Sequence, residues 1–143
     1  MTNHKKLRFA FENAEGQSET ESLWAYELTT GYEIDNIPFY AKNVAVGDLV
    51  SAEQDEQGLL WFSELIRPSG HSTVRIWFAR KDDVPIVREQ LRQLGCSSEL
   101  SDLDRLVAVD IPPSVRYEDV KMVLDDGESA GTFEYEEACR ATL

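Results

Sequence analysis

The stretch Pro68–Thr73, PSGHST, is the densest group of potentially reactive side chains in the sequence. His71 could act as a general base, and a hydroxyl such as that of Ser72 could serve as a nucleophile. Adjacent residues of an extended chain point to opposite sides, however, so His71 and Ser72 do not readily pair. No Gly-x-Ser-x-Gly turn surrounds them. The stretch therefore indicates a hydrogen-bonded turn first, and an enzyme with His71 as general base only third.

Polar residues near this turn could instead contact a small ligand. Arg75 could clamp an anion, and the irregular stretch after Asp35 supplies amide, phenol and carboxylate groups. The candidate ligand contacts are Asn36, Tyr40, Asp48, His71, Ser72 and Arg75. This interpretation makes the protein a small-molecule-sensing regulatory module with a polar site around His71, and it is the second hypothesis for function.

Metal and cofactor binding are not expected. The two histidines are His4 and His71, and neither cysteine belongs to a CxxC or to a histidine-spaced pair. Cys96 and Cys139 are expected to be buried free thiols, with a disulfide as the alternative. The glycines fit turns and helix ends, and none forms a phosphate-binding loop.

Acidic residues gather in the second half of the chain. A catalytic pair would need one carboxyl group buried with a raised pKa, whereas these runs are typical of a solvated edge that blocks strand pairing. The alternative is an acidic docking face for a basic partner. The candidate partner-binding residues are Asp102, Asp104, Asp125, Asp126, Glu128, Glu134, Glu136 and Glu137.

The composition describes a folded, acidic chain. Its 143 residues carry a formal net charge of −13, and 42% of them are hydrophobic. Such a charge repels phosphates and disfavours direct nucleic-acid binding, while it favours a basic partner or simply maintains solubility. No run of about 18 apolar residues exists, and the N-terminus does not resemble a secretory signal. A cytoplasmic protein without membrane contact is expected, with its oligomeric state left open.

The first half alternates apolar and polar residues with a period of two, which predicts strands. KLRFAFE and SLWAYELT show this alternation, and residues 45–68 read as a hairpin. Pro38 keeps its neighbour extended and cannot donate to a sheet, so residues 35–38 are expected to form an irregular crossover. Phe39 is expected to plug the barrel end, and Gly47-Asp48 to turn into the next strand. We therefore expect an N-terminal β subdomain over residues 1–68, built as a bent antiparallel sheet or partial barrel.

The second half combines strands with two helical stripes. A helix is expected over residues 82–95, with Pro85 in its first turn and Gly95 at its end. A second helix is expected over residues 114–127, with Gly127 as its terminator. With strands at 71–79, 96–101, 105–112 and 132–140, the order predicts a ferredoxin-like βαββαβ subdomain over residues 69–143. The whole chain is expected to be one α+β structural unit.

Three tryptophans, Trp24, Trp61 and Trp77, fall on expected strands. Core packing is the first interpretation, because aromatic side chains on sheets usually fill the interior. If they are exposed, they are natural hot spots of a binding interface.

Several stretches together resemble a bacterial family classed as a domain of unknown function. They are ESLWAYEL, YEIDNIPFYAKNVAVGDLVSAE, SGHSTVRIWF and YEEAC, with the motifs Leu-Trp-Ala, Asn-Ile-Pro-Phe, Val-Gly-Asp-Leu-Val and Ser-Gly-His-Ser-Thr. The resemblance covers roughly residues 20–140 and implies no activity or catalytic residue. In size, charge and general build the chain also resembles immunity proteins of bacterial toxin systems.

The first hypothesis for function is therefore a non-enzymatic binding protein. An immunity-type inhibitor would neutralise a basic bacterial toxin domain, possibly a nuclease, by occlusion. Its acidic residues would mimic a phosphate-bearing substrate and speed association, and its aromatic side chains would supply buried contact area.

Overall fold

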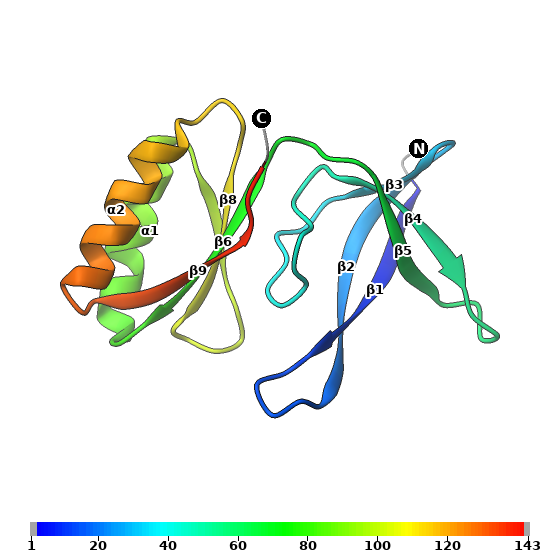
Figure 1. The fold of residues 1–143 in the computed structure, drawn as a ribbon, viewed down its shortest axis with the longest axis horizontal. Coiled ribbons are helices and arrows are strands. Elements are labelled where there is room, and N and C mark those ends of the chain that lie inside the picture. The colour runs from blue at the N-terminus through cyan, green and yellow to red at the C-terminus, as the bar shows by residue number, and fades with distance from the viewer. Residues whose placement is uncertain (1–2, 142–143) are drawn as a thin grey trace.

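A computed structural model describes residues 3–141 of the protein, and within them the chain forms nine strands and two α-helices. The first five strands close into a barrel, and the last four form a second sheet (Figure 1). The barrel strands are β1 (His4–Glu12), β2 (Ser18–Leu28), β3 (Gly31–Ile34), β4 (Leu49–Gln54) and β5 (Leu60–Arg67). Both halves are thus built on β-structure.

The barrel is a five-stranded meander that closes on itself. Consecutive strands pair antiparallel, while β1 pairs with β5 in parallel through Leu7 opposite Leu60 and Arg8 opposite Trp61. With an odd number of alternating strands, the first and last run in the same direction, so the closing pair has to be parallel. The buried side chains inside the barrel are Leu7, Phe9, Leu23, Ala25, Ile34, Ala41, Val44 and Val50.

The second sheet carries both helices on one face. Its strands are β6 (Ser72–Phe78), β7 (Ser97–Leu100), β8 (Leu106–Ile111) and β9 (Phe133–Cys139), in the order β7-β8-β6-β9 and paired antiparallel throughout. A 3₁₀ turn (Lys81–Asp83) leads into α1 (Val84–Leu94), and α2 (Tyr117–Ser129) precedes β9. Figure 1 shows α1 and α2 on the face that points away from the barrel.

Strand β6 divides its side chains between two environments. Val74, Ile76 and Phe78 are fully buried in the core between the sheet and the helices. Because side chains alternate along a strand, Arg75 and Trp77 lie on the opposite face, toward the barrel. The helices fill the core with apolar stripes at helical spacing, namely Val84, Val87 and Leu91 of α1 and Val120 and Leu124 of α2.

A loop over residues 35–48 connects β3 to β4 and lies between the barrel and the second sheet (Figure 1). The backbone N–H of Asn43 donates to the carbonyl oxygen of Ala138 at 3.0 Å, and the Thr73 hydroxyl donates to the carbonyl oxygen of Val44 at 3.4 Å. These bonds join the loop to β9 and β6, so the loop positions one half of the molecule against the other.

The same loop corrects one expectation about the barrel end. Ala41 and Val44 pack into the barrel core, whereas Phe39 is only partly buried and lines a cavity outside it. Residues 35–38 are irregular, as the sequence predicts, and the irregular segment continues to residue 48, with smaller side chains than Phe39 closing the barrel.

The predicted fold class is wrong. Strands hold 45% of the described residues and helices 19%, so the fold is dominated by β-structure rather than α+β. The N-terminal part is a closed barrel and not a bent sheet or partial barrel, because β5 returns to β1. The second half does have the predicted βαββαβ order, β6-α1-β7-β8-α2-β9, with both helices on one face of an all-antiparallel sheet.

Local predictions for the helices can be compared with the structure. Helix α1 is confirmed within residues 82–95: Pro85 lies in its first turn, and Gly95 ends it with a left-handed φ of 106°. Helix α2 instead continues past Gly127 to Ser129. Neither helix is long and apolar enough to cross a membrane within residues 3–141.

Candidate functional site

A cavity of about 300 Å³ opens between the 35–48 loop and the barrel-facing side of the second sheet. Phe39 and Tyr40 of the loop form one wall, and β6, β8 and β9 form the other. The sheet contributes Arg75, Trp77, Leu106, Glu134, Tyr135 and Glu136. Two halves of the fold therefore meet here, which is a common position for binding sites.

Two aromatic side chains of this cavity face solvent. Trp77 is 43% exposed and Tyr40 is 38% exposed. The Tyr40 ring stacks on Phe11 with centroids 5.0 Å apart and an angle of 7° between the planes, which holds the ring in place. The core-packing interpretation of the tryptophans is thus wrong for Trp77, and also for Trp24, which is 39% exposed on the barrel.

Arg75 lies at the base of the cavity and is 6% exposed. It donates a hydrogen bond to the carbonyl oxygen of Ala41 and forms an ion pair with Glu136, with 3.4 Å between Nη1 and Oε1. Burial lowers the pKa of the guanidinium group, and the Glu136 carboxylate opposes that change. Because a buried charge needs a partner, Glu136 is committed to Arg75.

Glu21 of β2 determines the shape of the loop wall. Its carboxylate accepts hydrogen bonds from three consecutive backbone N–H groups, those of Phe39 at 2.7 Å, Tyr40 at 3.0 Å and Ala41 at 2.9 Å. A carboxylate that accepts hydrogen bonds from three consecutive N–H groups holds the backbone of those residues in one conformation. A loop without regular structure has no such restraint of its own. Tyr40 is therefore presented to the cavity on a rigid segment.

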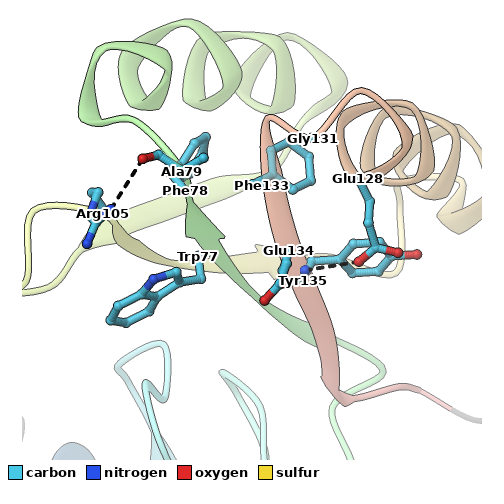
Figure 2. Close-up of a pocket in the computed structure, with 9 residues that line it drawn as sticks. All are labelled: Trp77, Phe78, Ala79, Arg105, Glu128, Gly131, Phe133, Glu134 and Tyr135. Atoms are coloured by element: carbon cyan, nitrogen blue, oxygen red, sulfur yellow. Dashed lines mark hydrogen bonds between the residues drawn. The ribbon is translucent and has the colours of Figure 1, made fainter.

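Glu134 and Trp77 lie side by side on the opposite wall. They are directly paired across β6 and β9, so their side chains emerge on the same face. Figure 2 shows both pointing toward the barrel, while Phe133 and Tyr135 turn toward the helices. The two residues also line a wider groove of about 610 Å³ that continues the cavity toward Arg105 and Gly131.

The surroundings of the cavity are acidic. Burial raises the pKa of the Tyr40 hydroxyl, and the carboxylates of Asp102, Glu21 and Glu19 raise it further. On the sheet wall, Glu134 adds a further carboxylate, while the charges of Glu136 and Arg75 offset each other. Arg105 lines the adjoining groove, but the carboxylates outnumber it, so the nearby charges favour a cationic ligand over an anion.

The six predicted ligand contacts separate into two groups. Tyr40 and Arg75 line the cavity, but the other four make hydrogen bonds within the protein. Asn36 accepts from the N–H of Trp24 at 2.6 Å, Ser72 accepts from the N–H of Ala141 at 2.9 Å, and Asp48 accepts from the N–H groups of Ala45 and Ser69 at 2.9 and 2.8 Å. These three residues hold loops in place.

His71, the fourth of these residues, has a partner that sequence reasoning missed. Its Nδ1 atom lies 2.9 Å from Oδ1 of Asp110, a buried carboxylate on β8. Burial raises the pKa of the Asp110 carboxyl, and the hydrogen bond and charge of His71 oppose part of that rise. A charged residue in the otherwise apolar strand LVAVDI was the available signal that a partner had to exist.

Asp110→Asn tests the electrostatics of this pair. Because the folded-state pKa of Asp110 is raised, the stability tied to its protonated form is present near pH 3.5 and is lost as pH rises through the folded pKa. The unfolding free energy of the wild type relative to Asp110→Asn should therefore fall as pH rises above 3.8, the ordinary pKa of an aspartate. Urea unfolding at several pH values measures it, and a flat or rising difference would contradict the prediction.

The eight predicted partner-binding residues do not form one face. Asp102, Glu134 and Glu136 lie around the cavity. Asp125, Asp126 and Glu128 lie on α2, and Glu137 faces the same side, where it accepts a hydrogen bond from Tyr117. Asp104 is exposed in the loop before β8. The first three lie with the exposed aromatic side chains of the cavity, and Glu128 lines the adjoining groove with Trp77 and Glu134.

In the described part of the chain, the cysteines form no reactive site, and the residue types that bind metals form no metal site. Cys96 and Cys139 are free thiols, and burial raises the pKa of Cys96 to about 11, which keeps it unreactive. No group of three or more histidine, cysteine, aspartate or glutamate side chains is placed to hold a metal within residues 3–141.

Comparison with known proteins decides the family. The family model described as a domain of unknown function (DUF4265) matches residues 21–135. The chain belongs to this family. The resemblance to a domain of unknown function is thereby confirmed, while the resemblance to immunity proteins stays a prediction. No curated protein matches the chain.

A solved structure shares the architecture of this DUF4265 chain. The crystal structure of a hypothetical protein from Neisseria gonorrhoeae is similar, with a TM-score of 0.86 and 25% sequence identity over 99% of this chain and 98% of that chain. The barrel and the second sheet, and hence the space between them, thus belong to an arrangement found in both proteins.

Proposed function

We propose that this protein is a non-enzymatic binding protein that takes up a basic segment of a protein partner in the cleft between the barrel and the second sheet. One observation carries the proposal: exposed Tyr40 and Trp77 share a cavity with Glu134, inside an acidic surrounding. Aromatic side chains supply contact area at interfaces, and complementary charge speeds association and selects the partner.

The finer identity is the one that the sequence suggests. An immunity-type inhibitor would present this cleft to a basic toxin domain and block the toxin by occlusion. The net charge of −13 supports a basic partner. Small-molecule sensing is the second candidate, because Tyr40 and Arg75 line the cavity, and a melting-temperature screen of metabolites tests it. The acidic surroundings favour the protein partner.

Charge reversal in the cleft should release the partner. The tagged wild type, a Glu134→Lys/Asp102→Lys variant and a Glu118→Lys/Asp126→Lys control are used for affinity capture from cells of the native host at low salt. We expect one basic protein at equal stoichiometry on the wild type and the control, and about 10-fold weaker binding to the cleft variant in a follow-up titration with that purified protein.

The four substituted residues are all exposed, so each variant should fold. Glu118 and Asp126 are exposed carboxylates on α2, away from the cleft, and reversing both gives the same change in net charge as reversing the two cleft carboxylates. Equal capture by all three proteins would overturn the cleft as the binding surface. Capture of nothing at low salt would overturn the binding function itself.

A further inference from the structure

Strands β6 and β9 place two neighbouring pairs of residues on the barrel-facing side of the second sheet. Arg75 lies opposite Glu136, and two residues further along Trp77 lies opposite Glu134. The first pair is complete, because the guanidinium group and the carboxylate form an ion pair. The second pair offers a carboxylate and an indole ring without a cation, since Glu134 forms no ion pair or side-chain hydrogen bond within residues 3–141.

An aromatic ring beside a free carboxylate is suited to a guanidinium group. The flat cation stacks on the ring through its face, while its N–H edge donates to the carboxylate. Lysine can approach the same ring but presents a compact, strongly hydrated ammonium group that cannot stack. Arg75, which lines the cavity with Tyr40 and pairs with Glu136, shows that the same strands already hold one guanidinium group in this setting.

The size of the cavity limits what enters it. Its volume of about 300 Å³ lies at the lower end of ligand-binding cavities, which span about 300–1,000 Å³. One long side chain fits such a space, whereas a folded surface would contact only its rim. The wider groove beside Trp77 leaves room for the chain that carries that side chain.

We infer that the cleft recognises an arginine side chain of its partner, stacked on Trp77 and hydrogen-bonded to Glu134. This inference rests on the proposed function and adds the residue type that the partner inserts. The planar Tyr40 ring, held by Phe11, forms the opposite wall of the subsite. Arginine is therefore selected over lysine and over any neutral side chain.

Three short peptides test the inference on the whole protein. They are acetyl-Gly-Ser-Arg-Gly-Ser-amide and the same peptide with lysine or with citrulline, the neutral isostere of arginine, in the central position. Binding is followed by NMR through the indole N–H signal of Trp77, which is assigned by its loss in Trp77→Phe. The arginine peptide should shift this signal and bind about 5-fold or more tightly than the lysine peptide, and citrulline should leave it unchanged.

Variants separate the subsite from general charge attraction. Trp77→Leu and Glu134→Gln should each weaken binding of the arginine peptide about 3- to 10-fold. In these variants binding is followed through the backbone amide signals of β6 and β9, because Trp77→Leu lacks the indole signal. Trp24→Leu and Glu118→Gln replace an exposed tryptophan and an exposed glutamate outside the cavity, and they should change nothing. Equal binding of the arginine and lysine peptides, or unchanged binding to Trp77→Leu, would overturn the arginine subsite.

Failure of this inference can be told apart from failure of the proposed function. If charge reversal in the cleft releases the captured protein but Trp77→Leu binds it as tightly as the wild type does, the basic partner stands and the arginine subsite falls. If neither substitution affects the captured protein, the partner does not use the cleft, and both proposals fall.

Discussion

Replacing Gly127 by alanine should lower the free energy of unfolding by about 3 kcal/mol, although alanine is the better helix former. Gly127 lies inside α2, and a Cβ atom there would come within 2.1 and 2.2 Å of two ring atoms of Phe133. Phe133 is buried and packs edge-to-face on Phe78, with centroids 5.4 Å apart, so it has little room to move. Urea unfolding measures the loss.

Two variants make this prediction specific. Ser129→Ala, at an exposed position of the same helix, reports the change in helix propensity alone. Gly127→Ala combined with Phe133→Leu removes the ring that the new methyl group meets, so the pair should lose less stability than the two single variants added together. If the losses of unfolding free energy are additive, or if Gly127→Ala is more stable than the wild type, the packing of the Phe133 ring does not require glycine at position 127.

Glu21→Ala should cost about 3 kcal/mol of unfolding free energy and should also disorder the loop wall of the cleft. The substitution removes the acceptor of three backbone N–H groups, those of Phe39, Tyr40 and Ala41. Water replaces part of this loss, because the site is only partly buried. Urea unfolding gives the stability, and amide hydrogen exchange at residues 39–41 gives the local effect.

Glu19→Ala is the matched control, because Glu19 lies two residues earlier on the same face of β2 and is exposed. It should change the unfolding free energy by less than about 0.5 kcal/mol. Glu21→Gln, which keeps one accepting oxygen, should fall between the two. If exchange at residues 39–41 is as slow in Glu21→Ala as in the wild type, the carboxylate does not hold the loop.

The sequence predicts those features that depend on near neighbours. Alternation in KLRFAFE indicates a strand, and that segment is β1. The apolar stripe with Pro85 and Gly95 indicates a helix, and that segment is α1. The fold class is wrong because barrel closure depends on β5 meeting β1, a contact between distant segments that no local pattern encodes.

The errors at single residues have the same origin. Gly127 resembles a helix terminator because glycine is common there, but its role comes from Phe133, which approaches only in the folded protein. In the sequence, Glu21 resembles any exposed glutamate, because the backbone N–H groups that it binds lie at least 18 residues further along the chain. Alternation along β6 places the Trp77 side chain on the other face of the strand from the buried Ile76. It does not indicate that the barrel lies across from that face.

Strand β9 provides both Glu134 and Glu136 and also receives the hydrogen bond from Asn43 of the loop. During synthesis, the barrel can close once β5 has emerged from the ribosome, long before β9 exists. A nascent chain at that stage has neither the carboxylates nor the contact that seats the loop. The order of translation thus completes the cavity last, because Arg75 gains Glu136 and the loop gains the carbonyl oxygen of Ala138 only when β9 joins the sheet.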